Sequence, residues 1–254
     1  MSLSLDNRSN AGVALEGVTC VLGGKRVLDG LDLRVAPQSR LGIVGRSGAG
    51  KSTLLGLVAG LDEADDGTVS VFGETSTAGR LARSVLMPQR DCLLPWRTAL
   101  DNACLALENQ GVPRGEARRR AAPLFERFQL GGAESQRPAH LSGGMRQRVA
   151  FLRTLLAGKD VLLLDEPFGA LDAITRAELQ EWLTDLLATE PRTVLLVTHD
   201  VEEALLVCDR VIVLADGRVT AELDVDVPHG RSRRETVVDS SFIALRESAL
   251  EAIA

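Results

Sequence analysis

The sequence predicts an α/β fold, a largely parallel sheet covered by helices on both faces, with a separate helical lobe. Apolar runs of strand length, such as 161–164 and 193–197, alternate with helical patterns, which is typical of sheets whose strands are connected by helices. The pattern becomes helical near residues 98–157 and interrupts this alternation, which predicts the lobe. No run approaches the roughly 18–20 apolar residues that a membrane-spanning helix needs.

The expected elements of the first half follow from turn and helix signals. Short strands within 13–35 are separated by turns at Gly23-Gly24 and Asp29-Gly30, because these pairs favour tight turns. The arginine run 118–120 falls on a helix and is interpreted as a solvated face. The other expected elements are a strand at 41–44, a helix at about 51–59, strands at 68–72 and 84–87, and helices within 98–130 that begin at a Thr98–Asp101 capping box and break at Pro113.

The second half returns to the α/β pattern. Val201, Ala204, Leu205 and Cys208 fall on one helical stripe, so Cys208 is expected in the core. The expected elements are a helix after Gly144, a buried strand at 161–164, a long helix with an apolar stripe at 179–187, strands at 193–198, 211–214 and 218–223, and an amphipathic helix around 242–252.

Charge and composition argue against several classes of function. The net charge of −6 disfavours bulk nucleic-acid binding, which needs a basic face to replace counterions. The four cysteines show no CxxC or CxxH spacing, which argues against a zinc site or a disulfide framework. The first ten residues are polar and lack the apolar stretch of a secretory signal. We therefore expect a cytoplasmic protein that reaches a membrane only through a partner.

A glycine-rich segment between an apolar strand and a helix fits the pattern GxxxxGK[ST]. Its glycines let backbone N–H groups wrap a phosphate chain, and the following helix adds its positive end. The lysine is expected to neutralise the β- and γ-phosphates, and the serine hydroxyl to ligate Mg²⁺. The alternative is an ordinary glycine-rich turn, which the strand–loop–helix context disfavours. The segment comprises Gly45, Arg46, Ser47, Gly48, Ala49, Gly50, Lys51 and Ser52, and Thr53 extends it.

Two carboxylates follow the buried strand 161–164. Ligands of open α/β sheets bind at the carboxyl ends of strands, where Asp165 and Glu166 are delivered. Asp165 is expected to hold Mg²⁺, through water, and Glu166 to polarise the water that attacks the γ-phosphate. An acidic pair at this position can also cap a helix. The glycine-rich loop upstream favours the catalytic interpretation.

Ser142, Gly143 and Gly144 lie just before a predicted helix, within the string LSGGMRQR. Open backbone N–H groups and the helix dipole make this a second anion site. Because the two helix starts lie on different lobes, one nucleotide is not expected to reach both in the same molecule. We therefore predict two chains facing head-to-tail, with ATP between the Lys51 loop of one and the Ser142 loop of the other. A plain N-cap with a flexible hinge is the alternative for Ser142–Gly144 alone.

With these residues the sequence resembles the nucleotide-binding subunits of ABC transporters from about 13 to 223. LSGGMRQR matches the signature loop of the family, GRSGAGKST its Walker A loop and VLLLDEP its Walker B strand. The resemblance implies that Gln89 is the Q-loop glutamine, which touches Mg²⁺ and the water. It implies that Ala170-Leu171-Asp172 is the D-loop at the dimer seam. It also implies that His199 is the switch histidine, which contacts the γ-phosphate.

The family also implies an architecture. The expected fold is a P-loop NTPase (RecA-like) core with an antiparallel β subdomain and an inserted α-helical subdomain. The chain 1–254 would be one ABC ATPase domain. Its nucleotide-binding core would span about 13–88 and 158–223, the helical lobe about 89–157, and a short tail 224–254.

One position departs from the family. Adenine usually stacks on an aromatic residue near the start of the chain, but this chain has no tyrosine and places Leu22 there. Adenine would then rest on the aliphatic surface of Leu22 and Val27. We expect weaker base stacking and unchanged phosphate chemistry.

Two segments are similar to one importer branch of the family, which serves nitrate, sulfonates, taurine and pyrimidine-type thiamine precursors. They are 89–98, QRDCLLPWRT, and 165–176, DEPFGALDAITR. The resemblance implies transmembrane permease partners, indirectly a solute-binding protein, and a place on the inner face of the cell membrane. Trp96 either belongs to the groove that receives the permease or simply packs the start of the next helix.

Three other functions stay open. The chain could energise an exporter, or it could be a non-transport ABC ATPase acting on DNA or ribosomes. No long coiled-coil insertion and no second cassette is visible, which disfavours the non-transport class. A small-molecule kinase with a P-loop would leave LSGGMRQR and His199 unexplained.

Overall fold

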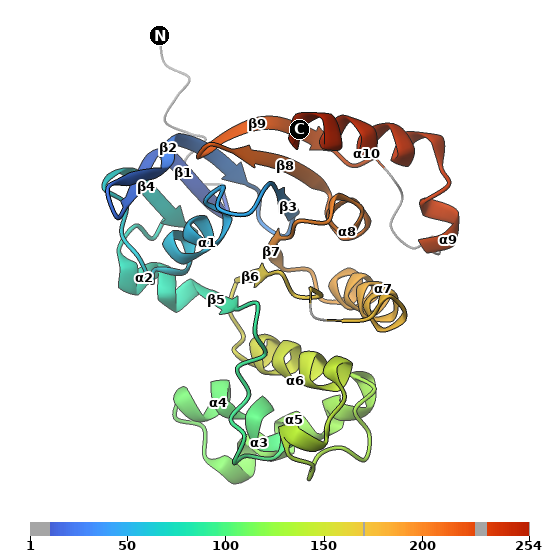
Figure 1. Ribbon diagram of the computed structural model, residues 1–254. Coiled ribbons are helices and arrows are strands. Elements are labelled where there is room, and N and C mark those ends of the chain that lie inside the picture. Colours follow the sequence, from blue (N-terminus) through green and yellow to red (C-terminus); the bar gives the residue numbers. More distant parts are fainter. Residues whose placement is uncertain (1–10, 170, 227–232, 254) are drawn as a thin grey trace. The chain divides into compact units, whose positions relative to one another are not determined.

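The structure is a computed structural model that describes residues 11–169, 171–226 and 233–253. Within these residues the chain forms two units, which Figure 1 shows with its element labels. The first unit takes its residues from Met1–Leu86, Asp160–Glu166 and Gln180–Ala254, and the second from Met87–Lys159 and Pro167–Leu179. In the part of the chain that the structure describes, no helix has both the length and the apolar character needed to cross a bilayer.

The first unit contains a small antiparallel sheet. Its strands are β1 (Val13–Leu22), β2 (Lys25–Val35) and β4 (Asp66–Val71), in the order β2-β1-β4. The Gly23-Gly24 pair joins β1 to β2, as the sequence predicted. This sheet supplies the start of β2, which lies beside the glycine-rich loop.

A larger six-stranded sheet positions the site. Its strand order is β5-β6-β7-β3-β8-β9. The pairs β6–β7, β7–β3 and β3–β8 are parallel, and β8–β9 is antiparallel. The loops after β3, β6 and β7 therefore leave from the same edge of the sheet. The strands are β3 (Arg40–Val44), β5 (Ser84–Met87), β6 (Val161–Asp165), β7 (Thr193–Val197), β8 (Arg210–Ala215) and β9 (Arg218–Asp224).

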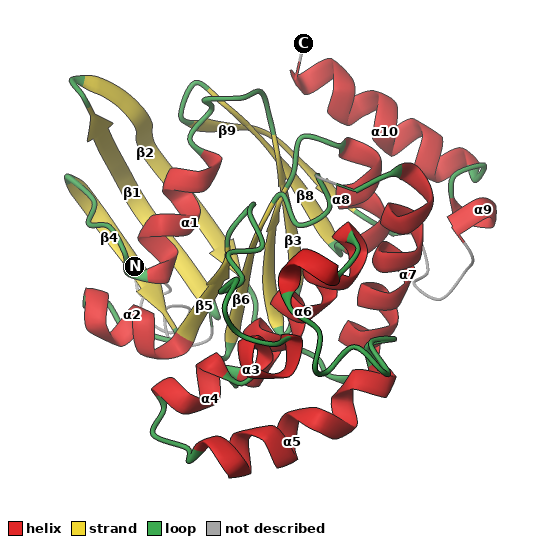
Figure 2. Cartoon of the chain, turned by 60° about the horizontal axis from the view of Figure 1, so that its bottom comes forward, coloured by secondary structure: helices red, strands yellow, loops and turns green. Residues whose placement is uncertain are grey.

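Apolar side chains cover both faces of this sheet, which explains why its strands are continuous apolar runs. One face and the small sheet share a core with α1 (Lys51–Ala59). The helix α8 (Val201–Val207) contacts β3 and β8, and α10 (Ser240–Ile253) contacts α8, β8 and β9 (Figure 2). The remaining helices with residues in this unit are α2 (Thr77–Arg83), α7 (Ala173–Thr189), which continues into the second unit, and α9 (Arg233–Thr236).

The predicted core residues are buried. Val161, Leu163 and Leu164 have no exposed surface, and Leu162 is 3% exposed, so the strand is buried on both sides as predicted. Cys208 is also fully buried, and all four cysteines are free, as the sequence indicated.

The second unit is helical. In the described residues it contains α3 (Ala99–Ala103), α4 (Leu105–Asn109), α5 (Arg114–Arg127), the 3₁₀ turn η1 (Pro138–His140), α6 (Gly143–Leu156) and the first part of α7. Thr98 caps α3 by accepting a hydrogen bond from the Asp101 N–H at 3.2 Å. The Asp101 side chain does not complete the expected capping box, because it is engaged with two arginines.

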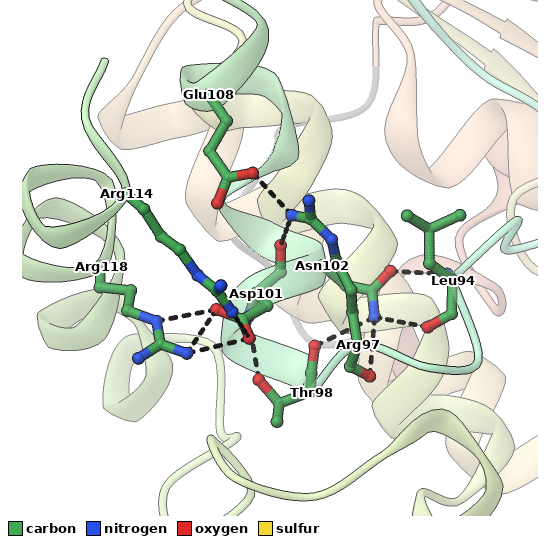
Figure 3. Close-up of polar contacts among 8 residues, drawn as sticks. All are labelled: Leu94, Arg97, Thr98, Asp101, Asn102, Glu108, Arg114 and Arg118. Atoms are coloured by element: carbon green, nitrogen blue, oxygen red, sulfur yellow. Dashed lines mark hydrogen bonds and ion pairs between the residues drawn. The ribbon is translucent and has the colours of Figure 1, made fainter. Parts of the chain in front are cut away.

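Asp101 is the buried charged centre of this unit (Figure 3). Its residue is 3% exposed, and its carboxylate accepts hydrogen bonds from Arg114 Nη2 and Arg118 Nε, both at 2.7 Å. Burial raises the pKa of Asp101, but the two arginines outweigh it, so the pKa lies below its ordinary value. Residues 118–120 are all exposed, as the sequence indicated, but Arg118 also reaches the buried carboxylate of Asp101. The sequence position of Arg118 showed the helix face, but not the acid on a neighbouring helix.

Asn102, which is fully buried, fixes the loop that precedes α3 (Figure 3). Its Oδ1 accepts a hydrogen bond from the Leu94 N–H at 2.7 Å. Its Nδ2 donates to the carbonyls of Leu94, Arg97 and Thr98 at 3.1, 3.3 and 3.0 Å. Trp96 lies within this loop and is 69% exposed. A rigid loop thus holds a large aromatic side chain in solvent.

We expect Asp101→Asn to destabilise the protein by about 2 kcal/mol at neutral pH, because it removes the acceptor of two partly exposed arginines at a buried position. Asp160→Asn is the matched control, since its pair with Arg83 is exposed on both sides and is expected to contribute at most about 0.5 kcal/mol. Urea unfolding measures both.

The pH dependence separates charge from packing. Because the folded pKa of Asp101 is lowered, its stabilisation is complete above the unfolded value of about 3.9 and is lost as the pH falls through the folded value. The Asn variant should therefore lose less stability than the wild type on acidification below about pH 4. Equal losses for Asp101→Asn and Asp160→Asn at neutral pH would contradict the central role of Asp101.

Candidate functional site

The glycine-rich loop joins β3 to α1 through backbone that only glycine can provide. A Cβ on Gly45 would lie 2.2 Å from the Leu214 carbonyl oxygen, and a Cβ on Gly50 would lie 2.8 Å from that of Val27. Gly50, with φ of 101°, is the N-cap of α1 and carries no side-chain cap. The first N–H groups of α1 therefore have no side-chain acceptor at Gly50, which is the arrangement that binds phosphate.

Lys51 begins α1 and folds back over the loop. Its Nζ donates hydrogen bonds to the carbonyls of Gly45 at 2.7 Å and Arg46 at 3.0 Å. The residue is 8% exposed. Burial lowers the pKa of the ammonium, while the Glu166 and Asp165 carboxylates oppose the shift. A partly desolvated cation beside open N–H groups suits a polyanionic ligand.

Ser52 and Asp165 come together from α1 and β6. The Ser52 hydroxyl hydrogen-bonds the Asp165 carboxylate. Burial raises the pKa of Asp165, and both Ser52 and Lys51 counteract this. A bound cation would offset the cost of this buried charge, and hydroxyl and carboxylate oxygens are the ligands that Mg²⁺ prefers. The donor set therefore fits a magnesium ion.

Glu166 and His199 meet at the ends of β6 and β7. The Glu166 Oε2 lies 2.6 Å from His199 Nδ1, which is within hydrogen-bond distance. Glu166 has a φ of 48°, a left-handed conformation that costs of order 1–3 kcal/mol outside glycine. Its N–H donates to the Val197 carbonyl at 2.8 Å, which holds the turn. Strain of this kind is typical of residues held in place for function.

The other predicted site residues lie in the second unit. Ser142 is the N-cap of α6 and accepts a hydrogen bond from the Met145 N–H at 3.2 Å. Asp172 Oδ2 accepts a hydrogen bond from the Thr175 hydroxyl at 2.7 Å, and Oδ1 caps the start of α7. A Cβ on Gly144 would lie 2.5 Å from Thr175 Cγ2, so the helix start and the Asp172 turn are neighbours.

Two further residues were predicted to belong to the site, Gln89 and Ala170. Gln89 is exposed, directly after β5. Ala170, part of the predicted D-loop, lies outside the described residues. Thus Lys51, Ser52, Asp165, Glu166 and His199 gather in the first unit, whereas the second unit carries Gln89, Ser142, Gly143, Gly144 and Asp172.

A cavity of about 430 Å³ adjoins the glycine-rich loop in the first unit. Leu22 ends β1 and is 54% exposed, but it is not among the described residues that line this cavity. Val27 does line it, and none of its described lining residues is aromatic. The lining consists of Lys25, Arg26, Val27, residues 45–49 and 214–217, Ala252 and Ile253.

Comparison with known proteins identifies the family. The sequence profile of ABC transporters matches residues 28–169. The chain belongs to the ABC transporter family. The matched segment includes the glycine-rich loop, the strand β6 with Asp165 and Glu166, and the start of α6.

Relatives in the ABC transporter family cover most of the chain. The aliphatic sulfonates import ATP-binding protein SsuB 1 of Rhodococcus jostii is 46% identical over 95% of this chain and 93% of that protein. The formylaminopyrimidine import ATP-binding protein ThiZ of Halalkalibacterium halodurans is 43% identical over 82% of this chain and 81% of that protein. The dimeric structure of MJ0796, a bacterial ABC transporter cassette, superposes with a TM-score of 0.74 and 29% identity over 85% of this chain and 100% of that chain. The resemblance and the fold class inferred from the sequence are thereby confirmed.

Sequence reasoning missed part of the cavity beside the loop of this ABC cassette. The turn at Asp216 and Gly217 could have been found, because an Asp-Gly pair between two strands indicates a hairpin. The contribution of Ala252 and Ile253 carried no sequence signal. It depends on where α10 packs, which local patterns do not specify.

Proposed function

We propose that the chain is the ATP-binding and ATP-hydrolysing subunit of an ABC importer for a small solute. The observation that carries the proposal is the convergence of Lys51, Asp165 and Glu166 at the carboxyl edge of the parallel sheet, in a member of the ABC transporter family. The two relatives described above are named as import ATP-binding proteins, which supports import rather than export.

The first unit binds the phosphates of ATP. The N–H groups of the loop 45–50 and the start of α1 surround the phosphate chain, and Lys51 exchanges its carbonyl contacts for β- and γ-phosphate oxygens. Ser52, Asp165 and Gln89 would hold Mg²⁺. When bound, the ion neutralises charge on the β- and γ-phosphate oxygens.

Glu166 orients and polarises the attacking water, and His199 contacts the γ-phosphate. The water oxygen bonds to the γ-phosphorus as the bond to the β–γ bridging oxygen breaks, and the electron pair leaves with ADP. The 2.6 Å contact between Glu166 and His199 fixes the carboxylate before the water arrives. The reaction yields ADP and inorganic phosphate.

Two copies complete the site head-to-tail. The Ser142–Gly144 helix start of the second copy binds the γ-phosphate through open N–H groups and the dipole of α6, a helix of 14 residues. Asp172 lies at the seam beside Gly144, through Thr175. The dimeric structure of the MJ0796 cassette supports a pair of copies. ATP joins the copies, and hydrolysis removes the shared phosphate contacts and reopens them.

The working partner is a transmembrane permease on the inner face of the cell membrane, with a solute-binding protein acting indirectly. The solute is nitrate, a sulfonate, taurine or a pyrimidine-type thiamine precursor, classes that the names of SsuB 1 and ThiZ support in part. Nucleic acid is not a partner.

Purification of the tagged chain from solubilised membranes of its own host tests the proposed permease partner. A multi-spanning membrane protein should accompany the chain. Nucleic acid or ribosomes in its place would favour the non-transport class.

Trp96 is proposed to contact the permease. The hydrogen bonds of Asn102 fix the loop that contains Trp96, and the Trp96 side chain is exposed to solvent. We expect Trp96→Ala to reduce solute uptake at least about tenfold, while the ATPase rate of the isolated subunit stays within about twofold. Leu81→Ala, a change at another exposed apolar side chain, is the matched control. Uptake in whole cells and ATP turnover of the purified chain measure the two effects. If Trp96→Ala transports normally, the residue merely packs the helix start.

A further inference from the structure

The first turn of α8 begins directly after His199. The chain leaves β7, passes His199 and enters α8, whose N-cap is Asp200. The Asp200 carboxylate accepts hydrogen bonds from the N–H groups of Glu202 and Glu203 at 3.0 and 3.3 Å. The Asp200 N–H donates to the Thr198 hydroxyl at 3.1 Å. His199 therefore lies in a short connection that is joined at one end to the sheet and at the other end to the first turn of α8.

The ring of His199 is not held by burial. Its side chain is 68% exposed, and in the described part of the chain its hydrogen-bond partner is the Glu166 carboxylate at 2.6 Å. Because so little of the ring is packed, the direction in which it points depends on the backbone that carries it. A contact that fixes the first turn of α8 therefore also limits the positions that the His199 ring can take.

Glu202 joins the first turn of α8 to the two C-terminal helices. Its carboxylate forms ion pairs with Arg233 of α9 and with Arg246 of α10, the second at 3.8 Å. The Glu202 side chain is 26% exposed, and the Nε atoms of both arginines are buried and have no hydrogen-bond partner among the described residues. Glu202 is thus the carboxylate that compensates both guanidinium charges.

These ion pairs reach a helix that is itself fixed. Phe242 and Ala249 of α10 are fully buried on either side of Arg246 in the sequence, and α10 contacts α8, β8 and β9 (Figure 2). Glu203, the next residue of α8, is 4% exposed and accepts a hydrogen bond from Gln180 Nε2 of α7 at 3.1 Å. All of these residues belong to the first unit. The first turn of α8 is therefore held both from α10 and from α7.

We propose that Glu202 is a positioning residue for ATP hydrolysis, and that its ion pairs with Arg233 and Arg246 fix the turn from which His199 reaches the γ-phosphate. The inference rests on the proposed function, in which His199 makes this contact. Glu202 acts through His199 and does not touch the nucleotide. It reduces the number of orientations that the His199 ring can adopt, which lowers the entropic cost of reaching the reactive geometry. Loss of the ion pairs lowers kcat and leaves the KM for ATP nearly unchanged, because the glycine-rich loop follows a different strand.

Steady-state ATP hydrolysis by the purified full chain tests the role of Glu202. Glu202→Gln keeps the shape of the side chain, removes its charge, and should lower kcat about fivefold with a KM within about twofold of the wild type. Glu222→Gln is the matched control, because Glu222 pairs with Arg210 at 2.6 Å in the same unit but lies on β9. Its kinetics should match the wild type. Urea unfolding verifies that both variants are folded.

A double-mutant cycle shows whether Glu202 acts through His199. His199→Ala should lower kcat about 10²-fold, because it removes a contact with the γ-phosphate. Adding Glu202→Gln to His199→Ala should change the rate by less than about 1.5-fold, since no ring remains to be positioned. Single-turnover phosphate release resolves these slow rates. A fivefold loss in both backgrounds would reveal a general effect on the fold and would overturn the inference.

A second set of variants approaches the same ion pairs from the arginine side. Replacing both Arg233 and Arg246 with methionine keeps much of the aliphatic stems and should lower kcat about fivefold. Replacing both with lysine keeps the two charges and should leave kcat within about twofold of the wild type. Unchanged kcat in Glu202→Gln and in the methionine variant, with His199→Ala still slow, would overturn the inference alone. Normal turnover by His199→Ala would overturn the role of His199 in the proposed function, and the inference with it.

Discussion

Replacing Glu166 with glutamine is expected to slow ATP hydrolysis by about 10²–10³-fold and to leave ATP binding nearly intact. The amide is a much weaker acceptor for the proton of the attacking water than the carboxylate, whereas Lys51 and Ser52 remain in place. The contact with His199 can survive as a hydrogen bond, so the geometry at the strand ends should change little. Phosphate release measures the rate, and titration with ATP and Mg²⁺ measures the binding.

The same variant should accumulate as a dimer. If two copies share each γ-phosphate, blocked hydrolysis preserves the shared contacts, and solution scattering should report a doubled mass with ATP and Mg²⁺. Glu181→Gln, a change at an exposed glutamate of α7, is the control and should turn over ATP and reopen like the wild type. A nucleotide-bound Glu166→Gln that stays monomeric would contradict the head-to-tail arrangement.

Elements whose sequence pattern is itself the physical cause of the structure were predicted well. The run 161–164 is apolar because both faces of the strand are covered, and it is fully or almost fully buried. The glycines at 45 and 50 are needed because neighbouring carbonyls approach too closely for a Cβ. In both cases the local surroundings allow only this residue type, apolar in the buried strand and glycine beside the carbonyls. The sequence alone therefore predicts the element and its place at the strand end.

Features that depend on how distant elements pack could not be predicted in the same way. Asp101 is buried because Arg114 and Arg118 of another helix neutralise it, and the spacing of these residues shows only that each lies on a helix. Ile253 reaches the cavity because Phe242 anchors α10. The assignment of the adenine surface to Leu22 and Val27 stays a prediction, because it depends on where the nucleotide lies against the folded chain and not on a local pattern.

We expect Lys51→Ala to reduce ATP turnover at least about 10²-fold, because it removes the ammonium that lies over the phosphate-binding loop and contacts its carbonyls. The chain contains three lysines, of which Lys159 belongs to the second unit and provides the control variant Lys159→Ala. The control should hydrolyse ATP within about twofold of the wild type. Turnover and nucleotide titration of the purified variants measure these effects.

Stability distinguishes a binding role of Lys51 from a structural one. Burial lowers the pKa of this ammonium, so the folded protein carries a cost for keeping the charge there. Its two hydrogen bonds to the carbonyls of Gly45 and Arg46 compensate in part. Removing the side chain should therefore change the free energy of unfolding by no more than about 1 kcal/mol, far less than its effect on the barrier to hydrolysis. Normal ATP turnover by Lys51→Ala would contradict the proposed contact between Lys51 and the phosphates. Loss of turnover that came only from unfolding would show a structural role instead. A stable but inactive variant would show that the buried ammonium of Lys51 serves nucleotide binding and hydrolysis and not folding.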